Sequence, residues 1–186
     1  MVRVTNESQV SEISSKDQVG IVLGINSSSE EDATGAVAAF LKANPDYEGN
    51  VAVVQSNHGL LDATMNHITG GISDPTHLKL VQDSVSRMLH VSKGNRVILI
   101  GHSDGSTALD RALGNLGVNG SNSRGIYYFG SPMSHSSVDN VHWVVRNGDP
   151  VTRAGSFWRF GFSDTTRLSG FGHSFEGYMR DAGAIW

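Results

Sequence analysis

The sequence predicts an α/β fold, a three-layer α/β/α sandwich built on a mainly parallel five-stranded sheet. Five short segments are rich in β-branched residues, and most are continuous apolar runs, as in parallel strands that are covered on both faces. Amphipathic helical patterns separate the first four of these segments. The third segment leads directly into a tight turn and another helical pattern. Strands that alternate with helices in this way are typical of a sheet with a helical layer on each face.

The five expected strands span residues 19–23, 51–55, 96–100, 125–129 and 141–145. A short loop joins the fourth strand to the fifth, and a long loop follows the fifth. The carboxyl ends of parallel strands meet at one rim of a sheet, where sites form. Functional residues are therefore expected in the loops that follow these strands.

Four helices are expected. The first should start near Ser28, where Ser28 and Glu31 have the spacing of a capping box and acidic residues fill the first turn. The second should begin at Asp74 and Pro75, a cap followed by proline at the first helical position. The third follows the tight turn and stops at Gly117. The last one presents a single apolar face, formed by Phe175, Tyr178, Met179 and Ala182.

Composition limits the class of protein. The 186 residues are 38% hydrophobic and 17% charged, which indicates one globular domain over residues 19–186 after a polar, flexible lead-in over 1–18. A net charge of −4 without a basic patch argues against nucleic-acid binding. The absence of cysteine excludes disulfides and thiolate metal sites. No signal-peptide core or membrane span is visible, so a cytoplasmic location is the default expectation, although a secreted chain whose signal had been removed would look the same.

Residues 97–105 carry the strongest chemical signal. An apolar run ends in Gly101-His102-Ser103-Asp104-Gly105, and a helical stripe begins at once. Strand, tight turn with a serine and then helix is the context of a nucleophile elbow, which lifts the serine Oγ off the sheet. Gly101 and Gly105 lack a Cβ where strand and helix nearly collide. The same pattern also fits an ordinary strand-to-helix turn with a serine cap.

A serine nucleophile needs a base, and the base needs an orienting acid. Asp149 follows the fifth strand and a turn sequence, which puts it on the same rim as Ser103. His173 lies in a glycine-flanked loop before the last helix. Asp164, in the loop between them, and Asp139, before the fifth strand, are rival acids. Asp149 is favoured because it follows a strand directly.

The other histidines fit the role of base less well than His173 does. His135 and His142 precede Asp149, so either of them as the base would break the usual chain order of serine, acid and histidine. His102 is expected to pack against the sheet. His58 and His67 lie nine residues apart and match no paired-ligand motif, so no metal is expected.

The chain resembles a small lipase- or esterase-type α/β-hydrolase of the class 3 lipase or cutinase-like kind. The residues that carry this likeness are Gly101-His102-Ser103-Asp104-Gly105, Tyr128-Phe129-Gly130-Ser131-Pro132, Asn147-Gly148-Asp149-Pro150-Val151 and His173. The likeness covers about residues 19–182. It implies a compact α/β-hydrolase fold and a triad in the order Ser103, Asp149, His173. Asp104 departs from the pattern, because many such enzymes carry a neutral residue directly after the serine.

An oxyanion hole needs two backbone N–H groups. Asp104 is the expected first donor, and Ile25 or Asn26, after the first strand, is the candidate for the second. The alternative role for Asn26 is to cap the first helix. Two segments are candidates for substrate binding or for covering an edge of the core. One contains Leu61, and the other contains Phe157, Trp158 and Phe160.

The resulting interpretation is a serine hydrolase of carboxylic esters, acting on lipid or small acyl esters through an acyl-enzyme on Ser103, with His173 as base and Asp149 as orienting acid. No cofactor is expected, and the partner is the ester itself. One alternative is a phospholipase or acyltransferase effector that works at a membrane surface. Another is a hydrolase-like binding module without activity. Acyl chain length and oligomeric state are not determined by the sequence.

Overall fold

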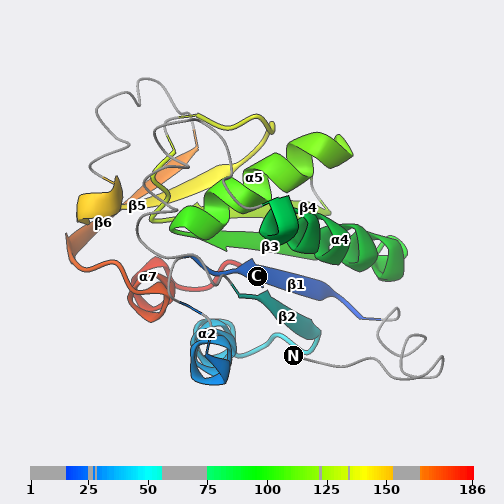
Figure 1. Cartoon of the computed structure of the whole chain (residues 1–186). Helices are drawn as coiled ribbons and strands as arrows, with labels where there is room; N and C mark the ends of the chain where they lie inside the picture. The colour runs from blue at the N-terminus through cyan, green and yellow to red at the C-terminus, as the bar shows by residue number, and fades with distance from the viewer. Residues whose placement is uncertain are drawn as a thin grey trace.

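The computed structural model describes residues 16–24, 27, 29–55, 75–121, 123–133, 135–152 and 164–186. Within these residues one parallel sheet is flanked by helices on both faces (Figure 1). The elements in chain order are β1 (Gln18–Val22), α2 (Glu30–Ala43), β2 (Asn50–Val54), α4 (Pro75–Ser92), β3 (Val97–His102), α5 (Asp104–Leu116), β4 (Arg124–Phe129), β5 (His142–Gly148), β6 (Thr165–Phe171) and α7 (Phe175–Ala182). Most of the expected lead-in, residues 1–15, lies outside the described part of the chain.

The sheet has the strand order β2-β1-β3-β4-β5-β6, and every neighbouring pair is parallel. The α/β sandwich is therefore confirmed, but the predicted number of five strands was wrong. The sixth strand, β6, forms the edge of the sheet beside β5, in a stretch that was expected to be a loop. It is mostly exposed and contains no continuous apolar run, because an edge strand need not be covered on both faces.

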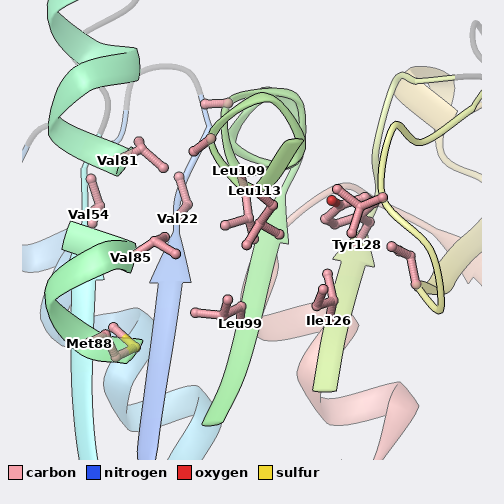
Figure 2. Close-up of a cluster of buried hydrophobic side chains, with 14 of the residues drawn as sticks. Val22, Val54, Val81, Val85, Met88, Leu99, Leu109, Leu113, Ile126 and Tyr128 are labelled. Atoms are coloured by element: carbon pink, nitrogen blue, oxygen red, sulfur yellow. The ribbon is translucent and has the colours of Figure 1, made fainter. Parts of the chain in front are cut away.

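Two apolar cores lie on opposite faces of the sheet. Leu99 points toward α4 and α5, whereas its neighbours Ile98 and Ile100 point toward α2 and α7, as the alternation of side chains along a strand requires. Figure 2 shows the core beneath α4 and α5, where Val81 and Met88 pack over strand residues. Fully burying one such side chain contributes about 1.5–3 kcal/mol. The strands β1 and β3 are buried along their whole length, so they form a stiff support for whatever follows them.

The described helix ends agree with the predictions except at one cap, and Asp74, the expected cap of α4, lies outside the described residues. Helix α4 begins at Pro75, and α5 ends at Leu116 with Gly117 as its C-cap, whose φ of 63° is left-handed. The N-cap of α2, however, is Ser29 rather than Ser28. Its hydroxyl accepts from the Asp32 backbone N–H at 3.1 Å, and the Asp32 carboxylate accepts from the Ser29 backbone N–H at 3.1 Å. Three serines followed by three acidic residues allow several capping registers, and only the fold selects one of them.

The chain passes from β1 to β2 on one side and then to β3 on the other. Such a topological switch leaves a crevice at the carboxyl ends of the two central strands. Gly24 comes shortly after β1, and Ser103 comes directly after β3, so both lie at this crevice.

No helix in the described ranges is long and apolar enough to cross a membrane.

Two glycines of the elbow have no room for a side chain. A Cβ on Gly105 would collide with the carbonyl oxygen of Val22, and one on Gly101 would collide with the backbone of Ser106. Gly101 therefore allows β3 and the start of α5 to approach closely, as the sequence pattern indicated, whereas Gly105 allows the start of α5 to approach the end of β1.

Gly105→Ala is expected to destabilise the protein by about 1–3 kcal/mol, because backbone rather than a flexible side chain must move. The control is Gly35→Ala within α2, where the nearest atom to a new Cβ would be a Glu176 carboxylate oxygen at 3.4 Å. That change should stabilise the helix by about 0.5–1 kcal/mol. Urea unfolding of both variants measures the difference, and equal stabilities would contradict the expected packing at Gly105.

Candidate active site

Ser103 has the backbone conformation of a strained turn. Its φ is 56° and its ψ is −133°, a combination that non-glycine residues rarely adopt. An N-cap serine would have an extended backbone and would accept a hydrogen bond from the helix, but the Ser103 hydroxyl makes no such bond. The alternative of an ordinary turn with a serine cap therefore does not hold. Strain of this kind costs about 1–3 kcal/mol and persists where the surroundings enforce it.

The surroundings of Ser103 hold the turn on three sides. Its N–H donates to the carbonyl of Phe129 on β4 at 2.9 Å, and its own carbonyl accepts from the Ser106 N–H at 3.1 Å. A Cβ on Gly24 would lie 2.7 Å from the Ser103 Cβ and 3.1 Å from the Asp104 nitrogen. The backbone after β1 thus passes directly beside the serine and beside the first amide of α5.

Asp149 and His173 form a hydrogen-bonded pair. The imidazole Nδ1–H donates to Asp149 Oδ2 at 2.6 Å. The same oxygen accepts from the Tyr178 hydroxyl at 2.6 Å, and Oδ1 accepts from the Val151 N–H at 2.8 Å. Asp149 has no exposed surface. Burial alone would raise the pKa of this carboxyl, but the hydrogen bonds from His173, Tyr178 and Val151 outweigh it and lower the pKa. Asp149 is therefore ionised at neutral pH.

The other ring nitrogen of His173 is free for chemistry. With Nδ1 committed to Asp149, Nε2 is buried and has no hydrogen-bond partner among the described residues. His173, Ser103 and Gly24 line the same cavity, which has a volume of about 260 Å³. A neutral imidazole in this tautomer presents a lone pair at Nε2, as a general base must. The remaining described residues around the cavity are Leu23, Ser27, Asp32, Ala36, His102, Val151, Phe175 and Glu176.

His102, expected only to pack against the sheet, also holds the backbone of His173. Its Nε2–H donates to the His173 carbonyl at 2.7 Å, and the two rings lie 4.9 Å apart. Desolvation by burial lowers the pKa of His102 to about 3, with a smaller contribution from His173. The ring is therefore neutral and bridges β3 to the loop before α7.

This buried histidine makes a prediction about acid stability. The folded-state pKa of His102, about 3, is below the unfolded value of 6.5, so the unfolded chain binds more protons between these values. Stability should therefore fall as the pH drops below about 6.5, and His102 alone should account for about 2 kcal/mol of loss at pH 5. Urea unfolding at pH 7 and pH 5 measures this loss. His102→Gln should reduce it, and an undiminished loss would show that other groups are responsible.

The chain is similar to known proteins in its structure but not in its sequence. No protein-family model matches the sequence, and no curated protein matches it significantly. An α/β serine hydrolase homologue from Coxiella burnetii matches with a TM-score of 0.51 at 13% identity, over 87% of this chain and 79% of that one. A protein from Xanthomonas campestris pv. campestris assigned to the α/β hydrolase superfamily gives 0.51 at 12% identity, over 88% and 94%. The fold is that of an α/β-hydrolase. A poly(3-hydroxybutyrate) depolymerase from Bordetella parapertussis gives 0.50 at 10% identity, over 89% and 76%.

Within this α/β-hydrolase fold, the rival residues lie apart from the pair. Asp164, which directly precedes β6, has its carboxylate against His142 Nδ1, and His142 Nε2 lies 2.8 Å from the Thr166 hydroxyl. Asp139 precedes β5, and its carbonyl accepts from the Gly120 N–H. The structure thus brings Asp149, and neither rival acid, to His173.

Several predicted site residues lie outside the described part of the chain. These are the second oxyanion candidates, the proposed substrate-binding side chains and the two weak metal-ligand candidates: Ile25, Asn26, Leu61, Phe157, Trp158, Phe160, His58 and His67. Asp104 is described, and its side chain is buried at the first position of α5.

Gly130 is a site residue whose role the sequence did not reveal. Its φ is 58°, and a Cβ there would lie 3.0 Å from both His173 Cε1 and Tyr178 Cε2, and 3.1 Å from Asp149 Oδ2. Backbone after β4 therefore packs directly against three side chains of the site. The Gly130-Ser131-Pro132 sequence could have drawn attention to this turn, but it carries no information about which side chains the turn contacts.

Proposed function

We propose that the protein is a serine hydrolase that cleaves carboxylic esters through an acyl-enzyme on Ser103. The observation that carries this proposal is the free Nε2 of an Asp149-bound His173, which lines the same cavity as a strained Ser103. These are the parts that serine acyl transfer requires: a nucleophile, a base and a group that orients the base.

In the proposed reaction, Ser103 Oγ attacks the acyl carbon while His173 Nε2 takes its proton. Asp149 holds the tautomer and stabilises the imidazolium that forms. The tetrahedral oxyanion accepts a hydrogen bond from the Asp104 N–H and a second from Ile25 or Asn26. His173 then gives its proton to the leaving alcohol as the bond from the acyl carbon to the alcohol oxygen breaks. Water attacks the acyl carbon with His173 again as base. The bond from the acyl carbon to Ser103 Oγ then breaks as His173 returns the proton to that oxygen, and the carboxylic acid leaves. No cofactor takes part.

Lipid or small acyl esters are the proposed substrates, in a lipase- or esterase-like enzyme. Leu23, Val151 and Phe175 give the cavity an apolar wall that suits an acyl chain. Leu61, Phe157, Trp158 and Phe160 are proposed to extend this wall.

Covalent labelling with a fluorophosphonate tests the proposal. The probe should react once per chain, and peptide mapping by mass spectrometry should find it on Ser103. Ser103→Ala should remove the label. Ser27→Ala, which changes another serine of the same cavity, should keep it. A wild-type protein that is folded and remains unlabelled would contradict an activated serine and would favour a hydrolase-like binding module.

A further inference from the structure

Tyr178 shares an acceptor atom with the imidazole. Its hydroxyl donates to Asp149 Oδ2 at 2.6 Å, and this is the same oxygen that accepts from His173 Nδ1 at 2.6 Å. The tyrosine is completely buried, and its ring packs edge-on against Phe129 at 6.0 Å between centroids. The acid of the site is therefore held by α7 as well as by its own loop.

Arg146 lies behind this arrangement. It is 3% exposed, and its guanidinium carbon sits 4.7 Å from the centre of the Tyr178 ring. One terminal nitrogen donates to the carbonyls of Phe171 and Gly172 at 3.2 and 3.3 Å, and the other donates to Asp181 at 2.7 Å. One buried cation thus contacts both the tyrosine and the two residues that precede His173.

We propose that Tyr178 is a positioning residue for the reaction: it fixes the Asp149 carboxylate and weakens it as an acceptor for His173, while Arg146 holds Tyr178 and the His173 loop together. This inference rests on the proposed function.

Asp149 Oδ2 divides its negative charge between two hydrogen-bond donors, His173 and Tyr178. A carboxylate oxygen that accepts a second strong hydrogen bond offers less charge to the first donor. Burial, followed by the hydrogen bond to Asp149 and its charge, raises the pKa of the Tyr178 phenol, so the hydroxyl stays protonated as a donor. Among the described residues, the ionisable groups around the pair are Asp32 from α2, His102 from β3, Arg146 from β5, and Tyr178, Glu176 and Asp181 from α7. Among them, Tyr178 is the one that donates to Asp149.

The test is Tyr178→Phe, which keeps the ring and removes the hydroxyl. The carboxyl carbon of Asp149, followed by carbon NMR, should titrate about 1 pH unit higher than in the wild type. The ester kcat/KM should fall about 10-fold, and the acidic limb of its pH profile should move to a new position. Arg146→Lys, which keeps the charge but not the planar fork, should lower kcat/KM in the same direction.

The matched control is Tyr128→Phe. Tyr128 is equally buried, and its hydroxyl donates to another buried aspartate, Asp110, at 3.1 Å on the other face of the sheet. Its loss should lower stability comparably but leave the Asp149 titration and the pH profile in place. If Tyr178→Phe loses stability as Tyr128→Phe does and moves neither readout, Tyr178 is merely a core residue and the proposal fails. The NMR titration needs no substrate, so an inactive wild type would overturn the proposed function while the contact between Tyr178 and Asp149 was still decided.

Discussion

Ser103→Ala is expected to lower kcat for ester hydrolysis by about 10⁶-fold, to the small residual that binding and the oxyanion donors provide. The reason is that the acyl-enzyme route needs an oxygen at this position, and the free His173 Nε2 then has no hydroxyl to deprotonate. The measurement is hydrolysis of p-nitrophenyl esters over a series of chain lengths. The wild-type profile also reports the size of the acyl pocket.

The strained backbone of Ser103 adds a second readout. Ser103→Gly should be as inactive as Ser103→Ala but more stable than it, by about 1 kcal/mol, because glycine adopts a φ of 56° without strain. Loss of activity together with a gain in stability would mean that the turn is strained to present the hydroxyl. Equal ester rates in wild type and Ser103→Ala would overturn the assignment of the nucleophile.

Asp149→Asn is expected to lower kcat by about 10⁴-fold. An asparagine amide can donate to His173 Nδ1, which would put the ring proton on Nε2 and leave no lone pair facing Ser103. The substitution also places an amide where Tyr178 and Val151 both donate, so stability should fall as well. Rates across the pH range and unfolding curves separate the two effects.

Asp164→Asn serves as the comparison for this change. Asp164 was the rival acid in the sequence, but it pairs with His142, and its side chain is largely exposed. Its substitution should change kcat by less than about 3-fold, since exposed pairs contribute little. A large loss in Asp164→Asn with a small one in Asp149→Asn would reverse the assignment of the acid.

The candidate site was predictable to the extent that its signals are local. The apolar run before Ser103 and the stripe after it predict a strand and a helix, and a serine in the turn between them can lie only at the rim of the sheet. Asp149 was predicted on the same rim because it follows a strand. The sequence favoured Asp149 over Asp164 because Asp149 follows a strand directly, but which of the two loops reaches His173 is decided by the tertiary structure.

The features that the sequence did not predict share one physical cause, since each of them is decided by the tertiary structure rather than by a local pattern. Strand β6 is recognisable only by its pairing with β5, because its exposed residues satisfy no periodic apolar pattern. The capping register at Ser29 was one of several that the sequence allowed. Gly130 and Tyr178 looked like a turn glycine and a core aromatic, and their contacts with Asp149 come from elements far apart in the chain.

By itself the sequence determined the alternation of strands and helices, the parallel sheet and the rim on which Ser103 and Asp149 lie, because periodicity and turn chemistry are properties of neighbouring residues. The tertiary structure decided between Asp149, which the sequence favoured, and its rivals as the acid that binds His173. It alone decided which oxygen Tyr178 shares with His173 and where the buried Arg146 charge is satisfied. Those contacts join β5, α7 and the loops between them, and their distances are set by how the helices pack on the sheet rather than by spacing along the chain.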